Sequence, residues 1–181
     1  MKKDQKRNEM SKTELIISLE DERWEEALPD FGTLSNKIVA AVFDYLIDQG
    51  DPDLLSLHKK LIIRLSLSND LDIQSLNTRY RNIDKPTNVL SFAAIDNDDF
   101  YKNLEFFDEI DLGDIIIALE TMQKEAKEKN ISFSDHYAHL LTHGILHLLG
   151  FDHIGDDDAD YMEYFEKEIL STLNIKNPYG D

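Results

Sequence analysis

The chain has 181 residues, which is enough to bury roughly two-thirds of the unfolded chain's surface in one core, so we expect one domain. It contains no cysteine, which excludes a disulfide framework, a thiolate nucleophile and a cysteine zinc site, and leaves His, Asp and Glu as the strong metal ligands. Its formal net charge of -18 excludes a general electrostatic attraction to nucleic acid, so an RNA partner has to meet a local basic patch.

The N-terminal segment is polar. Residues 1–12 are rich in Lys, also carry Asp4 and Glu9, and lack an apolar stretch, so we expect a flexible tail followed by a single domain over 13–181. The longest apolar runs of the chain are far shorter than a membrane span. These features and the lack of cysteine predict a cytoplasmic protein with no membrane partner.

Apolar periodicity predicts four strands and five helices. The strands are expected at 14–20, 60–67, 88–92 and 114–119. The helices are expected at 33–49, 71–80, 120–129, 132–149 and 156–173. Gly50 and Gly150 stand where C-terminal caps would lie, and Ser132 and Asp135 are spaced as a capping box. The mixed order of strands and helices predicts an α+β fold with a small mixed four-stranded sheet and about five helices.

Three histidines in the C-terminal part have the spacing of a zinc site. His143 and His147 are four residues apart on the predicted helix 132–149, so their imidazoles project from one face about a turn apart. Gly150 can adopt a left-handed conformation, which would end the helix and turn His153 toward the same ion. The pattern predicts one Zn²⁺ per chain held by His143, His147 and His153, the spacing of the metzincin group of zincins, with a fourth position open for water.

The residue after His143 departs from the zincin pattern. Zincins carry a Glu there as general base, whereas this chain has Gly144, so a peptidase mechanism would lack its base. A glycine within a helix costs on the order of 1 kcal/mol relative to Ala, which suggests a need for space at this position. We expect that space to admit substrate beside the metal.

The sequence alone does not decide the third metal ligand or the carboxylate that supports a metal-binding histidine. His139 precedes His143 by four and is an alternative to His153 as third ligand, but three ligands in one straight helical row surround an ion poorly. A metal-binding imidazole usually donates its second N–H to a carboxylate or carbonyl. The candidate carboxylates are Asp152, Asp156 and Glu166.

Two groups of cations are candidate basic patches on this acidic chain. One group comprises Lys59, Lys60 and Arg64, and the other comprises Arg79, Arg81 and Lys85. Charge patterning alone predicts that most of them are solvated surface charges.

Beyond the histidines, residues 60–174 resemble the YbeY family of bacterial endoribonucleases. The similarity rests on separate blocks of the chain: Leu76 to Arg81, Lys85 to Phe92, Leu112 to Ile115, the motif from His143 to His153, and Met162 with Glu166. Phe151 stands where Tyr is common in the family, and Asn88 stands where Asp is frequent. The residues before Lys60 match only in general pattern.

The resemblance implies a zinc-dependent, single-strand-specific endoribonuclease in 16S rRNA 3′-end maturation and ribosome quality control. It implies rRNA and small ribosomal subunit proteins as partners, with an assembly GTPase as a further candidate. The functional Arg of the family falls on Arg81. A guanidinium suits this role because it is always charged and can hold a phosphate through two hydrogen bonds.

The implied mechanism has zinc acting as a Lewis acid on the scissile phosphate while Arg81 holds the phosphoryl oxygens. The nucleophile is open between water and the RNA 2′-hydroxyl, and the general base is unassigned. Two other classes stay open. One is a non-catalytic assembly factor in which zinc only staples the last helices to the sheet, and the other is a metal-dependent peptidase.

Overall fold

The computed structural model describes residues 12–50, 53–57, 59–151 and 156–180. Four strands form its sheet: β1 (Lys12–Leu19), β2 (Lys60–Ser68), β3 (Val89–Ala93) and β4 (Glu109–Ala118). Their order is β1-β2-β4-β3, in which β1, β2 and β4 run parallel and β3 runs antiparallel to β4 at one edge. The predicted α+β class and the mixed four-stranded sheet are confirmed.

The inner strand β2 has one buried, apolar face and one partly polar face. Leu61, Ile63, Leu65 and Leu67 are fully buried, whereas Arg64 lies between them in sequence and is only partly buried. Successive side chains of a strand point to opposite faces, so the four apolar residues share one face. That face forms the main core together with α3, α7 and α8.

Strand β4 begins at Glu109, earlier than the predicted start at residue 114. The register of β4 against β2 shifts by one residue at Leu112, which is a β-bulge. Gly113 follows the bulge with φ +123°, and a Cβ at this position would lie 2.0 Å from the carbonyl oxygen of Phe92 on β3. Gly113 therefore lies inside β4, where the absence of a side chain lets β3 approach closely. In the sequence the same glycine suggests a strand boundary.

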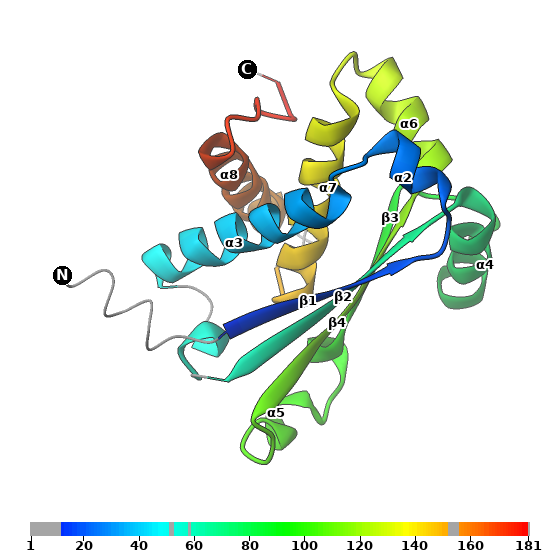
Figure 1. Ribbon diagram of the computed structural model, residues 1–181. Helices are drawn as coiled ribbons and strands as arrows, with labels where there is room; N and C mark the ends of the chain where they lie inside the picture. Colours follow the sequence, from blue (N-terminus) through cyan, green and yellow to red (C-terminus); the bar gives the residue numbers. More distant parts are fainter. Residues whose placement is uncertain (1–11, 51–52, 58, 152–155, 181) are drawn as a thin grey trace.

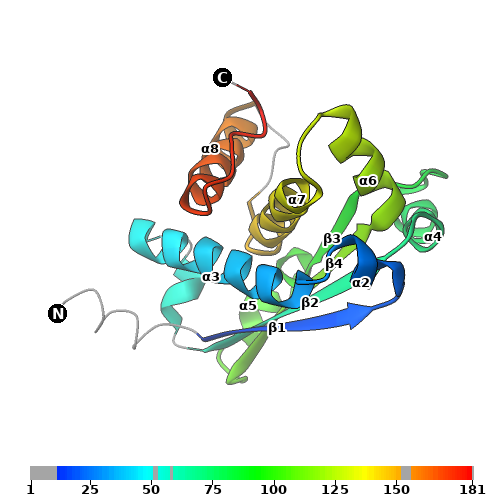
Figure 2. The ribbon, with the colours of Figure 1, turned by 45° about the horizontal axis from the view of Figure 1, so that its top comes forward.

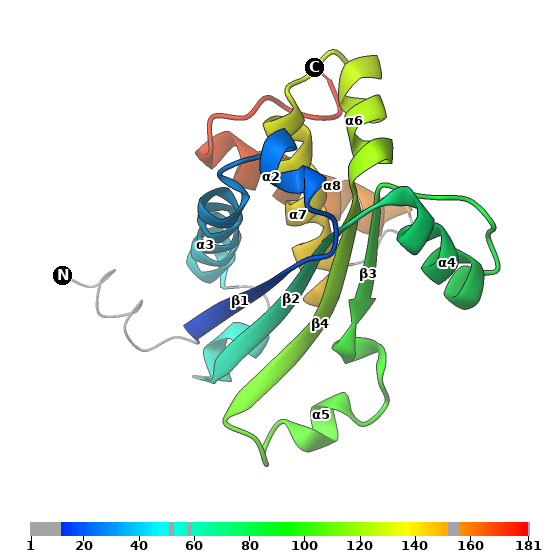
Figure 3. The ribbon, with the colours of Figure 1, turned by 45° about the vertical axis from the view of Figure 1, so that its right-hand side comes forward.

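Helices cover both faces of the sheet. Within the described residues the helices are α2 (Arg23–Ala27), α3 (Phe31–Gln49), α4 (Asp70–Arg81), α5 (Phe100–Asn103), α6 (Leu119–Glu128), α7 (Phe133–Leu148) and α8 (Asp156–Thr172), with 3₁₀ turns η1 (Asp53–Leu57) and η2 (Ala94–Asp96). Figures 1 and 2 show α3, α7 and α8 gathered on one face. Helix α4 packs on the other face, where Ile73 joins Leu90, Ile116 and Ala118 in a second small core (Figure 3). The edge strand β3 thus has α7 on one side and α4 on the other.

The five long helices match their predicted bounds to within two residues at each end. Gly50 and Gly150 have φ values of +78° and +89°, the left-handed conformation of a C-terminal cap. The Ser132 hydroxyl accepts a 3.0 Å hydrogen bond from the backbone N–H of Asp135, as the capping prediction requires. The sequence does not predict α2 and α5, because stretches of five and four residues are too short to show a helical period.

The expected N-terminal tail at 1–12 lies, apart from Lys12, outside the described residues. Lys12 is the first residue of β1. Among the residues that the structure describes, no helix is both long enough and apolar enough to cross a membrane.

Candidate active site

His143 and His147 lie one turn apart on α7 and line the same cavity. Their Nε2 atoms are 3.1 Å apart and their ring centroids 4.5 Å apart. Two nitrogens bound at about 2.0–2.1 Å to one tetrahedral ion would be separated by about 3.3 Å, so the two imidazoles converge as ligands of one ion do. The prediction that this pair shares one face of the helix is confirmed.

A buried carboxylate orients His143 from behind. Oε1 of Glu166, on α8, accepts a 2.6 Å hydrogen bond from Nδ1 of His143, which makes Nε2 the nitrogen on the side of the cavity. Burial alone would raise the pKa of Glu166, but hydrogen bonds from His139 and His143 outweigh burial and lower that pKa to about 2. Glu166 therefore carries a negative charge next to the imidazoles, and it is the one of the three candidate carboxylates whose contact with His143 the described residues show.

His139 turns toward Glu166 and is not among the residues that line the cavity. Its Nε2 atom lies 3.1 Å from Oε2 of Glu166 and 3.3 Å from the hydroxyl of Tyr179. The Tyr179 hydroxyl also donates to the same carboxylate oxygen. This geometry favours a supporting role for His139, as a partner of Glu166, over the alternative of a third metal ligand.

Gly144 does not open room for substrate, so the prediction from the sequence is wrong at this point. A Cβ on Gly144 would lie 3.0 and 3.1 Å from two side-chain carbons of Ile115 and 3.2 Å from Oγ of Ser91. The glycine is needed because α7 passes unusually close to the sheet here. A Glu at this position, as in zincins, would project toward the sheet, so this site cannot use the zincin base.

The cavity has a volume of about 440 Å³ and lies between α7, β3 and the end of α4. Its lining residues come from both helices, the edge strand and the segments next to them: Arg81, Thr87, Asn88, Val89, Ser91, Ala93, Asp96, His143, His147, Gly150 and Phe151. Arg81 is the last residue of α4, which ends where Asn82 adopts a left-handed conformation with φ 57°. The fold thus brings Arg81 to the same cavity as His143 and His147, although the two histidines are far from Arg81 in the sequence.

The third predicted ligand, His153, lies outside the described residues, as does Asp152, and the side chain of Asp156 is not described. Within the described ranges no group of three side chains is placed to hold a metal ion. The fit to zinc therefore rests on two converging imidazoles and the carboxylate behind one of them, a donor set typical of zinc sites.

Two residues of the site have no clear signal in the sequence. Tyr179 reaches Glu166 from the segment after α8, and no spacing rule links a tyrosine there to a helix-borne glutamate. Asp96 lines the cavity from η2, but its place in an acidic run predicts only a solvated surface charge. Both depend on tertiary contacts that the sequence pattern does not contain.

The fold and the cavity together define a class, a single α+β domain in which two imidazoles and an arginine line the same cavity. The family profile described as Endoribonuclease YbeY matches residues 33–174. Proteins named Endoribonuclease YbeY from Paramagnetospirillum magneticum and Sinorhizobium fredii are 36% and 39% identical to the chain. These matches cover 93% and 95% of the chain and 96% and 95% of the two relatives. The chain belongs to the YbeY endoribonuclease family.

A solved structure supports the fold. The solution structure of TM1509 from Thermotoga maritima superposes with a TM-score of 0.52 at 21% sequence identity. The superposition covers 89% of this chain and 92% of that one. At this level of identity the similarity concerns the architecture alone.

Proposed function

We propose that the protein is a zinc-dependent endoribonuclease that cleaves single-stranded RNA and acts in 16S rRNA 3′-end maturation and ribosome quality control. One observation carries the proposal: Arg81 from α4 and both His143 and His147 from α7 line one open cavity. Phosphodiester hydrolysis needs groups that hold a metal ion and groups that neutralise phosphate charge, and both kinds are present. Relatives named as endoribonucleases support RNA as the substrate.

In this proposal His143, His147 and His153 hold one Zn²⁺. When bound, zinc supplies Lewis-acid polarisation of the phosphate and lowers the pKa of a nucleophile. The hydrogen bond to Glu166 fixes the proton of His143 on Nδ1, so that Nε2 keeps its lone pair for the metal. Nickel or copper would accept the same ligands, so the metal content of the purified protein is part of the test.

Arg81 is proposed to hold the phosphoryl oxygens of the scissile group. Its planar guanidinium matches two phosphate oxygens and stays charged at every physiological pH. The Arg81 side chain is exposed and forms no ion pair within the described residues, so a phosphate can bind without displacing an internal partner. Negative charge that develops on the phosphoryl oxygens then meets a fixed positive charge.

The general base has a candidate in Asp96. Among the described residues that line the cavity, Asp96 provides the carboxylate, and the position of Gly144 against the sheet excludes a base of the zincin kind. A base next to the attacking hydroxyl contributes about 10²–10⁴-fold to the rate. The substitution Asp96→Asn is therefore expected to lower kcat with the metal content unchanged, and an unchanged kcat would remove Asp96 from the mechanism.

The proposed setting is the cytoplasm, with rRNA and proteins of the small ribosomal subunit as partners and an assembly GTPase as a further one. The net charge of -18 supports an attraction to basic ribosomal proteins. The same charge requires that RNA be met by a local positive surface, which Arg81 helps to provide beside the cavity.

The test uses RNA that contains the 16S 3′ precursor region, incubated with wild type, His147→Ala and Arg81→Ala proteins purified in parallel. Parallel purification controls for contaminating ribonuclease. Cleavage by wild type but by neither variant supports the proposal. Equal cleavage by all three proteins, or by none with zinc still bound to wild type, contradicts it. The end groups of the product separate water from the RNA 2′-hydroxyl as nucleophile, because only the latter leaves a 2′,3′-cyclic phosphate.

A second candidate function is a non-catalytic assembly factor in which zinc is a structural staple. It is supported by the hydrogen bond between His143 and Glu166, because a metal held by α7 would also be tied to α8 through this contact. Chelation would then unfold the protein, with no catalytic defect apart from the unfolding. A metal-dependent peptidase is less well supported, since the base that such enzymes carry is replaced by Gly144.

A further inference from the structure

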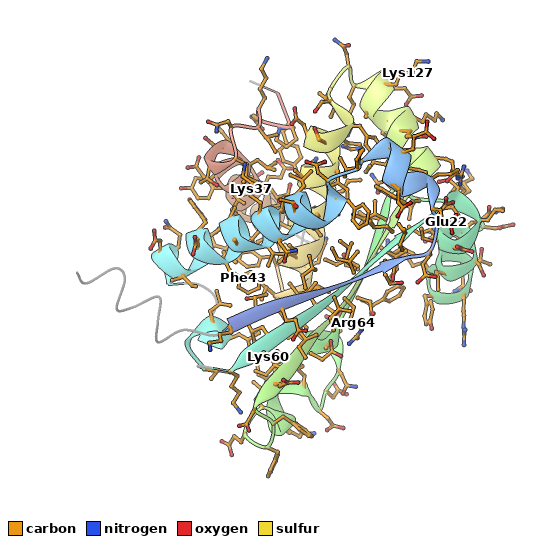
Figure 4. The ribbon with its side chains drawn as sticks, in the orientation of Figure 1. Glu22, Lys37, Phe43, Lys60, Arg64 and Lys127 are labelled. Carbon is orange, nitrogen blue, oxygen red and sulfur yellow. The ribbon has the colours of Figure 1, made fainter. Side chains whose placement is uncertain are left out.

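The structure separates the two groups of cations that the sequence offers as basic patches. Lys60 binds two glutamates at 2.5 and 2.8 Å, and Arg64 binds two aspartates, one of them Asp114 at 2.7 Å. Lys59 donates to the backbone carbonyl of Phe107. Figure 4 marks Lys60 and Arg64 on the sheet. Carboxylates of the protein itself therefore neutralise Lys60 and Arg64, and Lys59 is held by backbone carbonyls, which leaves this first group little positive charge for a phosphate.

The second group is placed differently. Arg79, Arg81 and Lys85 form no ion pair within the part of the chain that the structure describes. The other two described arginines, Arg23 and Arg64, each bind two carboxylates. On so acidic a chain, three cations without acidic partners at one helix end form a local surface that can displace counterions from a nucleic acid.

Tyr80 adds an exposed aromatic ring to this surface. The residue is 57% exposed. Its ring makes an edge contact with the ring of Phe92, with centroids 5.1 Å apart. The guanidinium of Arg79 lies over the ring, 5.4 Å from its centroid. An exposed ring that packs against the sheet and lies next to a guanidinium is the kind of platform on which proteins stack a nucleotide base.

This platform stands next to the cavity, across the edge strand. Phe92 supports Tyr80 on the α4 side of β3, while its neighbours Ser91 and Ala93 line the cavity on the α7 side. Arg81, which follows Tyr80 directly, lines the cavity as well. An RNA strand leaving the cavity past Arg81 therefore meets Tyr80 and Arg79 as it crosses the end of β3.

We propose that Tyr80 and Arg79 form a base-stacking subsite for single-stranded RNA, in which a base flanking the scissile phosphate stacks on the Tyr80 and Arg79 pair. Lys85 and Arg79 contact the phosphates of the same strand. The subsite rests on the proposed function only in taking RNA as its ligand. It gives a physical reason for single-strand preference, because a base inside a duplex has both faces covered and cannot stack on a protein ring.

Binding is measured by fluorescence anisotropy with a labelled oligouridylate of about 12 nucleotides, within the span that such surfaces cover. All proteins carry His147→Ala, so that the RNA stays intact during the measurement. Tyr80→Leu keeps apolar packing against Phe92 but removes the π-face, and Tyr80→Trp keeps a π-face. Lys37→Gln is the charge control for Arg79→Gln, because Lys37 is exposed on α3, on the opposite face of the sheet (Figure 4).

We expect Tyr80→Leu to weaken binding about fivefold or more, the usual effect of losing one stacked base, with Tyr80→Trp close to the parent. Arg79→Gln is expected to weaken binding and to reduce the slope of log Kd against log salt by about 0.7, the value for one lost phosphate contact on a single strand. Lys37→Gln is expected to change neither. An RNA duplex of equal length should bind Tyr80→Leu and its parent alike.

The proposal is overturned if Tyr80→Leu and Arg79→Gln bind the oligouridylate as Lys37→Gln does. It is equally overturned if Tyr80→Leu weakens duplex and single strand to the same extent, since that would indicate a general disturbance of the surface. The proposed function fails separately. Without His147→Ala, a chain that cleaves no RNA yet shows Tyr80-dependent binding would refute the nuclease and keep the subsite. RNA cleavage whose KM is the same in wild type and Tyr80→Leu would support the nuclease and refute the subsite.

Discussion

Oε1 of Glu166 lies 2.6 Å from Nδ1 of His143, so a fully buried carboxylate on α8 fixes the ring of a histidine on α7. The contact sets which nitrogen of His143 faces the cavity, and it joins the last helix to the site. The other carboxylate oxygen is held by His139 and Tyr179. The site therefore has a supporting layer drawn from three parts of the C-terminal half of the chain.

Loss of the negative charge on Glu166 is expected to weaken metal binding. The substitution Glu166→Gln should reduce zinc affinity by about 10- to 100-fold, the usual effect of removing a carboxylate behind a metal-binding histidine. Competition with a chromophoric zinc chelator measures the affinity directly. Glu163→Gln, an exposed glutamate on the same helix, is the matched control and should leave the affinity unchanged. Equal affinities in all three proteins would show that Glu166 does not support the metal.

Arg81 is expected to act on the reaction and not on the metal. Removal of one preorganised positive group from a reacting phosphate typically lowers kcat by about 10²–10³-fold. Arg81→Ala should show a loss of this size with zinc content and thermal stability equal to those of wild type. Arg81→Lys should recover only part of the loss, because an ammonium cannot bind two phosphoryl oxygens as a planar fork does. Full activity in Arg81→Ala would exclude the phosphate-binding role.

The close packing of α7 against the sheet at Gly144 can be tested by comparing alanine substitutions at Gly144 and at Gly32, a helical glycine with free space around it. A Cβ at Gly144 would press on Ile115 and Ser91, whereas a Cβ at Gly32 on α3 would meet nothing within 4 Å. Gly32→Ala should therefore leave stability unchanged or raise it by up to about 1 kcal/mol, the helix preference of Ala. Gly144→Ala should lower it by about 1–2 kcal/mol, because Ile115 is fully buried and has little room to yield. Denaturant unfolding measures both, and a stabilised Gly144→Ala would contradict the close packing.

The sequence predicts the five long helices, the four strands and the helical pair of histidines because these follow from local pattern. Ser132 and Gly150 mark the ends of α7, and apolar periodicity places its buried face. The start of β4 depends on a bulge at Leu112, and a bulge breaks the alternation on which strand prediction relies. The role of Gly144 could not be predicted either, because helical spacing does not reveal how close the sheet lies. Tyr179 and Asp96 join the site through tertiary contacts alone.

His136 makes the stability of the folded protein sensitive to acid. The ring is fully buried, its Nε2 atom donates a 2.7 Å hydrogen bond to Glu125, and its Nδ1 atom has no hydrogen-bond partner among the described residues. Burial lowers the pKa of His136 below its ordinary value of 6.5, although the contact with Glu125 opposes the shift. Between 6.5 and the folded pKa the unfolded chain binds more protons, so the free energy of unfolding falls as the pH decreases through this window.

The substitution His136→Gln removes this titration and keeps an N–H donor for Glu125. Its free energy of unfolding should therefore change less than that of wild type between pH 7 and the acid end of the window, although its stability at pH 7 is lower. Urea unfolding at a series of pH values gives both curves. Parallel curves for the two proteins would show that His136 does not carry this part of the pH dependence.

Metal dependence of RNA cleavage can be measured on one preparation, by removing zinc with a chelator and then restoring it, with His147→Ala protein treated in the same way. We predict that cleavage of single-stranded RNA disappears on chelation, that the chain stays folded, and that added zinc restores cleavage to wild type only. Cleavage that persists without metal, or that zinc restores equally in His147→Ala, would contradict a zinc-dependent active site in this cavity.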